Sequence, residues 1–127
     1  MHSKPTHGFT LIEVLVVLTI IATLLSLVSP RYFEAVERSK EVSLRHDLSV
    51  MRDAIDKYYS DRGIYPSSLE EMVERKYLRA VPEDPITQSI ESWITSPPAD
   101  PYLHGDVYDV HSGSPDIAQD GSNYADW

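Results

Sequence analysis

GFTLIEVLVVLTIIATLLSLV, at residues 8–28, is the stretch that decides the architecture of this chain. From Phe9 to Val28 the residues are apolar, and the only interruptions are Thr, Ser, Ala and a single charge, Glu13. About 20 apolar residues at a rise of 1.5 Å each cross the ~30 Å hydrocarbon core of a bilayer as one helix. The stretch therefore predicts a membrane-spanning helix over residues 9–29.

An amphipathic segment follows Pro30 directly. Its apolar residues recur at three- and four-residue spacing, and charged residues fill most of the other positions, which is typical of a water-soluble helix with one buried stripe. The stripe consists of Val36, Leu44, Leu48, Met51, Ile55, Tyr58 and Tyr59. Gly63 is a signal for the end of a helix. We therefore expect residues 30–62 to form the second half of one long helix and to supply the core of a small domain.

Residues 63–127 are expected to form the globular part of that domain. Ser67-Ser68-Leu69-Glu70-Glu71 offers two overlapping capping boxes, which predict a short helix to about Tyr77. Residues 92–96 and 106–110 are candidate strands, and residues 111–126 are rich in turn formers and acids. The expected fold class is α+β, with a long N-terminal helix packed by its second half on a short helix, a small antiparallel sheet and loops.

The charge of the chain is concentrated at one end. The 127 residues carry a net charge of -9, and all of it falls in residues 80–127, which contain nine acids and no Lys or Arg. An acidic protein of this kind is the wrong partner for nucleic-acid phosphates. Because the chain has no cysteine, it has no disulfide or thiolate site. The repulsion among the carboxylates predicts either full solvation or a bound cation.

Gly8-Phe9-Thr10-Leu11-Ile12-Glu13 resembles the leader junction of the type IV pilin superfamily, which includes the pseudopilins of type II secretion. The resemblance implies that residues 1–8 are a leader peptide and that a membrane aspartyl peptidase cuts between Gly8 and Phe9. It also implies that the same enzyme methylates the new N-terminal Phe9. The fold implied is the type IV pilin-like fold.

Glu13 supports this interpretation on physical grounds. A carboxylate in hydrocarbon costs at least about 2.5–3.5 kcal/mol, so it is rare without a partner. Cleavage after Gly8 would create an amine on Phe9, four residues away. In a filament, Glu13 of one copy would neutralise the Phe9 amine of its neighbour and fix the register between them. The alternative is an ordinary signal anchor that contains a glutamate by chance.

Two later segments are similar to the major pseudopilin of type II secretion systems: Val81-Pro82-Glu83-Asp84-Pro85 and Val107-Tyr108-Asp109-Val110-His111-Ser112-Gly113. That likeness implies a non-enzymatic subunit anchored in the bacterial inner membrane, with residues 30–127 in the periplasm. The implied partners are copies of itself in a helical filament, other pseudopilins, the prepilin peptidase and the inner-membrane assembly platform. Two alternatives stay open: a type IV pilin of surface fibres, and an uncleaved membrane-anchored binding domain.

The same likeness implies a calcium-binding loop near the end of the chain. Calcium prefers six to eight oxygen ligands, and the candidates are the side chains of Asp116, Asp120 and Ser122 with the carbonyls of Val110 and Ser112. Asp126 is a further possibility. The alternative is an acidic loop that is merely solvated. For Trp127 the sequence leaves two roles open, a cap on this loop or an exposed contact.

Overall fold

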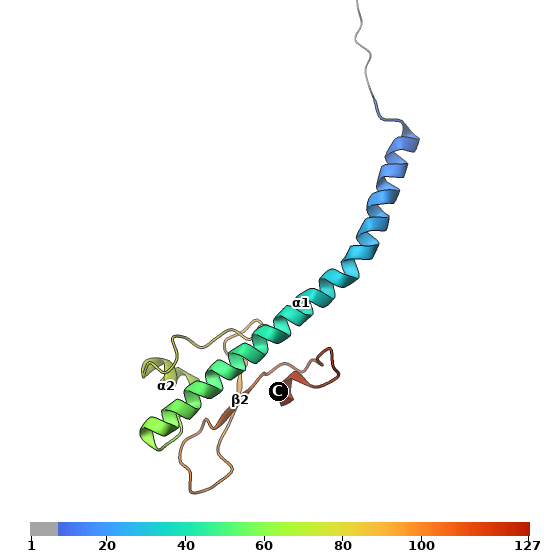
Figure 1. Ribbon diagram of the computed structural model, residues 1–127. Coiled ribbons are helices and arrows are strands. Elements are labelled where there is room, and N and C mark those ends of the chain that lie inside the picture. Colours follow the sequence, from blue (N-terminus) through green and yellow to red (C-terminus); the bar gives the residue numbers. More distant parts are fainter. Residues whose placement is uncertain (1–7) are drawn as a thin grey trace, which may run out of the picture. The chain divides into compact units, whose positions relative to one another are not determined.

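The structure is a computed structural model that describes residues 8–127. In chain order it contains the helix α1 (Leu11–Arg62), the short helix α2 (Leu69–Glu74), the strands β1 (Ile94–Ser96) and β2 (Asp109–His111), and the 3-10 turn η1 (Tyr124–Asp126) (Figure 1). The predicted α+β class is confirmed. The chain forms two compact units that divide after Val36. Residues 1–7 of the predicted leader lie outside the described residues.

In the first unit, residues 8–36, the described structure is the N-terminal part of α1 and the three residues before it. The helix begins at Leu11, two residues later than the start of the apolar run, because Thr10 caps it. The backbone N–H of Glu13 donates to Thr10 Oγ1 at 3.1 Å, which satisfies one of the free N–H groups of the first turn. The acid of Glu13 also lies in that first turn, where the helix dipole favours a negative charge.

The hydroxyl groups within the apolar run are satisfied by the helix itself. Thr19 Oγ1 donates to the carbonyl of Leu15 at 2.7 Å, and Thr23 Oγ1 donates to the carbonyl of Thr19 at 2.8 Å. Ser26 Oγ donates to the carbonyl of Thr23 at 2.9 Å. A polar group that is bonded internally does not need water. These hydroxyls are therefore compatible with a hydrocarbon environment.

The second unit, residues 37–127, is built on the remainder of α1. Five residues of the predicted stripe are buried, which confirms its periodicity: Leu44, Leu48, Met51, Ile55 and Tyr58. They join α2, the strand β2 and the loops in one apolar cluster. Figure 1 shows α2 and β2 beside this part of α1. The helix ends at Arg62, as predicted, because Gly63 adopts a positive φ of 71° and closes the last turn.

The short helix α2 begins as the sequence predicts and ends earlier. Ser68 is its N-cap and accepts the backbone N–H of Glu71 at 3.1 Å. The Glu71 carboxylate accepts from the backbone N–H of Ser67, one residue before the cap, at 2.8 Å. The helix stops at Glu74 and not near Tyr77, because Lys76 takes a positive φ of 65° and turns the chain. The N–H of Tyr77 then bonds back to the carbonyl of Met72 at 2.8 Å.

The two strands form a small antiparallel sheet in which Thr95 pairs with Val110. Both are three residues long. The strand β1 lies within the predicted range 92–96, whereas β2 overlaps the predicted range 106–110 and ends one residue beyond it. Val110 is fully buried against the core. Trp93, which precedes β1, is a buried anchor as predicted, and its Nε1–H donates to the carbonyl of Pro82 at 2.8 Å.

Candidate functional site

The predicted processing site lies just before α1 and is exposed. Gly8 and Phe9 precede the helix, and 80% of the Phe9 side chain is accessible. A Cβ atom built on Gly8 meets no other atom of the described chain within 4 Å. The fold of this chain therefore does not demand a small residue at position 8. If a small residue is needed there, the requirement comes from the enzyme that recognises the junction.

Glu13 is a lone acid on an apolar helical surface. Its side chain is exposed, and within residues 8–127 no ion pair to it is formed. The neighbouring side chains are also uncovered, with Leu11 78% and Ile12 73% accessible. By length and composition α1 is the one helix among the described residues that could cross a membrane. The most apolar stretch of this helix is not buried by any other part of the described chain. Its apolar surface is thus available to lipid or to other copies.

The predicted calcium ligands fall into a buried pair and an exposed group. Val110 and Ser112 are fully buried, whereas Asp116 and Asp120 are exposed, and Ser122 is half-buried. Three of the five predicted ligand groups already have hydrogen-bond partners within the protein: the Val110 carbonyl, the Asp120 carboxylate and the Ser122 hydroxyl. The Val110 carbonyl accepts a hydrogen bond from Arg52 Nη2 at 2.9 Å. For Ser112 the predicted ligand atom is the carbonyl, and its hydroxyl is a separate group that donates to Asp84 Oδ2 at 2.5 Å.

Asp120 and Ser122 bond to each other. Asp120 Oδ1 accepts from the backbone N–H of Ser122 at 2.9 Å and from its hydroxyl at 2.5 Å. These bonds hold the pKa of Asp120 below its ordinary value, and Arg45 lowers it further. No group of three or more acidic, His or Cys side chains suited to a metal occurs in residues 8–127. Two of the three predicted side-chain ligands, Asp120 and Ser122, are thus bonded to each other within the protein, and calcium binding stays a prediction.

The structure surrounds the loop with charged residues of α1 to which the sequence analysis gave no role. Arg52 Nε donates to Asp109 Oδ1 at 2.8 Å, and its Nη2 also donates to the backbone oxygen of Trp127. The guanidinium of Arg45 lies 4.0 Å from the centre of the Trp127 indole. Glu41 Oε1 accepts from the hydroxyl of Tyr124 at 2.9 Å.

The spacing of these residues along the sequence is a signal that could have identified them. Glu41, Arg45 and Arg52 lie four, then seven residues apart, so they share the face of α1 that carries the buried Leu48. Residues 80–127 contain no Lys or Arg, so a basic partner of these acids other than a histidine can come only from the earlier part of the chain.

Asp84 is a second residue whose role the sequence did not reveal. Its side chain is fully buried, and Oδ1 accepts the backbone N–H of Ile86 at 2.8 Å. Through the Ser112 hydroxyl, Oδ2 ties this turn to the end of β2. The two segments that resembled one family in sequence are therefore joined directly by a buried hydrogen bond.

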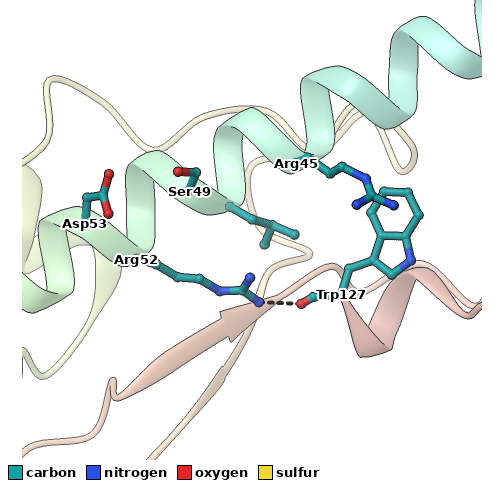
Figure 2. Close-up of a pocket in the computed structure, with 6 residues that line it drawn as sticks. Arg45, Ser49, Arg52, Asp53 and Trp127 are labelled. Atoms are coloured by element: carbon teal, nitrogen blue, oxygen red, sulfur yellow. Dashed lines mark hydrogen bonds between the residues drawn. The ribbon is translucent and has the colours of Figure 1, made fainter.

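The open side of this region is a surface hollow of about 480 Å³. It is lined by Arg45, Leu48, Ser49, Arg52, Asp53 and Trp127. Figure 2 shows Arg45 and Arg52 reaching from the helix toward Trp127, with the bond from Arg52 to the Trp127 oxygen dashed. Trp127 is thus a cap on the loop, the first of the two roles that the sequence left open.

Comparison with known proteins shows similarity over most of the chain. The family model of the prokaryotic N-terminal methylation motif matches residues 3–29. The type II secretion system core protein G of Escherichia coli K12 is 34% identical, and the match covers 87% of this chain and 82% of that protein. The protein of the same name from Klebsiella pneumoniae is 28% identical, with 95% and 94% covered.

A fimbrial protein, EcpC of Eikenella corrodens, is 33% identical over a shorter region, 64% of this chain and 56% of that protein. No solved structure matches the chain.

Proposed function

This chain belongs to the family of type II secretion system core protein G, and from that premise we propose how it is processed and assembled. As a member of that family it is a pseudopilin subunit of a type II secretion system. The fibre-forming pilin alternative is less favoured, because the core protein G relatives match more of the chain than the fimbrial relative does. The proposal gives the chain a structural role and no catalytic one.

The first step is processing of the N-terminus. A prepilin peptidase would cut between Gly8 and Phe9 and methylate the Phe9 amine, with the chain anchored in the inner membrane and residues 30–127 in the periplasm. The exposed junction directly before α1 supports this step, as does the methylation-motif match over residues 3–29.

The second step is pairing between copies. The observation that carries this step is the lone carboxylate of Glu13 in an apolar surface that nothing in residues 8–127 covers. Such a group is stable in a membrane only with a partner. The Phe9 amine of a neighbouring copy would supply the opposite charge, and the pair would set the axial register of the two helices.

The third step is growth of a filament. When a subunit leaves the bilayer, its apolar helix must be buried again, and other copies offer the matching surface. A head-to-tail contact that does not close on itself generates a helical fibre. Other pseudopilins and the assembly platform of the inner membrane would be the further partners.

The proposed pairing is tested with Glu13→Val and Glu13→Gln in cells that depend on this chain for secretion. We expect both variants to insert in the membrane and to be processed, but to form few filaments and to lose most secretion. The control is Glu74→Gln, which removes one exposed acid in the second unit, far along the chain from the junction. Normal filaments from Glu13→Val would contradict the pairing.

A further inference from the structure

The region from β2 to Trp127 has to be held against α1, although it carries acids and has no cysteine, Lys or Arg of its own. Arg52 supplies the connection. Its guanidinium donates to the Asp109 carboxylate, to the Val110 carbonyl and to the Trp127 backbone oxygen. One side chain of α1 thus fixes β2 and the end of the loop at the same time, by charge-assisted bonds that are the stronger kind.

Trp127 closes the loop on the other side. Its Nε1–H donates to Ser122 Oγ at 2.8 Å, and its ring meets Tyr124 edge-on at 5.1 Å between centres. The Arg45 guanidinium covers the indole at 4.0 Å, within the range of a cation–π contact. The loop is therefore pinned both by its backbone, through Arg52, and by its last side chain.

Glu41 adds a third attachment one turn before Arg45. Its Oε1 accepts from the Tyr124 hydroxyl and from the backbone N–H of Gln119, both at 2.9 Å. Tyr124 is 2% exposed, so this bond is made in a largely dry environment. Burial raises the pKa of Tyr124, and the neighbouring Glu41 raises it further. The hydroxyl therefore stays protonated and continues to donate.

These contacts compete with a metal ion. A calcium ion on the Val110 carbonyl would lie next to the Arg52 guanidinium, and two cations at such short range repel each other. Ser122 Oγ already accepts from Trp127 and donates to Asp120. An ion at the Val110 carbonyl would therefore have to compete with the Arg52 guanidinium for that oxygen.

We propose that the clamp formed by Glu41, Arg45, Arg52 and Trp127 takes the place of a bound metal as the staple of the C-terminal loop. Folding of the loop is then independent of calcium. This inference concerns the second unit alone, so it stands or falls independently of the proposed filament assembly.

The test is thermal unfolding of the full chain in detergent, in millimolar calcium and in excess EGTA. Intrinsic fluorescence reports on the loop, because Trp127 is one of only two tryptophans. We expect the same Tm for the native chain in both buffers. A calcium ion bound to the folded loop would raise Tm by roughly 10 °C or more at about a hundredfold excess over its Kd. A rise of that kind would overturn the inference.

The variant Arg52→Met tests the clamp itself, since it keeps an apolar stem and removes the guanidinium. Both Arg52 and Asp109 are about one third exposed, so solvent weakens the pair, and we expect Tm to fall by roughly 5–10 °C, equally in both buffers. The matched control is Arg79→Met at an exposed position, which should leave Tm unchanged.

If Arg52→Met fails to fold, Trp127→Leu gives a milder probe, because it removes the indole N–H and the cation–π contact but leaves the Arg52 bonds. The clamp predicts a lower Tm for Trp127→Leu in both buffers and faster proteolysis after residue 112. A Tm equal to that of the native chain for either variant would overturn the proposal.

Discussion

Glu71 is the acid whose contribution to stability the structure specifies most closely. Its carboxylate accepts from the Tyr58 hydroxyl at 2.6 Å, from the Ser67 backbone N–H at 2.8 Å and from the Ser67 hydroxyl. Arg75 Nε donates to it at 3.1 Å. These bonds, led by the Ser67 hydroxyl, lower the pKa of Glu71 from 4.5 to about 2. Glu71 thus joins α1, α2 and the turn between them.

The magnitude and its pH dependence follow from that shift. Each pKa unit corresponds to about 1.4 kcal/mol, so the shift sets an upper limit of about 3 kcal/mol. Because the side chain is 20% exposed, we expect about 1–2 kcal/mol in practice. A pKa that is lower in the folded state means that the stabilisation is complete above pH 4.5 and is lost as the pH falls toward 2.

The assay is denaturant unfolding of the native chain and of Glu71→Gln at a series of pH values. We expect the variant to be less stable at neutral pH by about 1–2 kcal/mol, and the difference to shrink steadily below pH 4.5. The control is Glu74→Gln, an exposed acid of the same helix. A difference between native chain and Glu71→Gln that stays constant across the whole pH range would refute the reasoning.

Three further predictions concern single positions. Asp84→Ala should cost about 1–3 kcal/mol in denaturant unfolding, because it leaves the buried Ser112 hydroxyl without its acceptor; a cost no larger than that of Glu83→Ala would contradict this. Gly113→Ala should lower Tm, since a Cβ there would lie 2.0 Å from the Ser92 carbonyl oxygen and would force the strands apart. An unchanged Tm for this variant would contradict the close approach of the two backbones. Gly8→Ala should still be processed and Gly8→Leu should not, as judged by the size of the chain in membranes; processing of Gly8→Leu would refute the cleavage assignment.

The sequence predicted the parts of the fold that depend on local periodicity. Three local signals define α1: the apolar run, the stripe from Leu44 to Tyr58 and the glycine at 63. Each of them depends only on residues that lie within one or two helical turns of one another. The Ser68 cap belongs to the same class of local signals. The end of α2 was placed too late, because the left-handed conformation of Lys76 has no clear signature in a lysine.

The C-terminal loop lay beyond such reasoning, because its contacts join distant parts of the chain. Arg52 and Asp109 are 57 positions apart, and Glu41 and Tyr124 are 83 positions apart. Sequence alone showed the excess of acids there and predicted either full solvation or a bound cation. It did not show that arginines of α1 reach the loop. For the same reason the role of Trp127 became clear only from the fold.

The most direct test of the proposed processing is the mass of the N-terminal peptide of the protein purified from membranes that contain a prepilin peptidase. We expect a peptide that begins at Phe9 and carries one added methyl group on its amine. A peptide that still begins at Met1 would leave Glu13 without the amine it needs, and would contradict both the processing and the filament built on it.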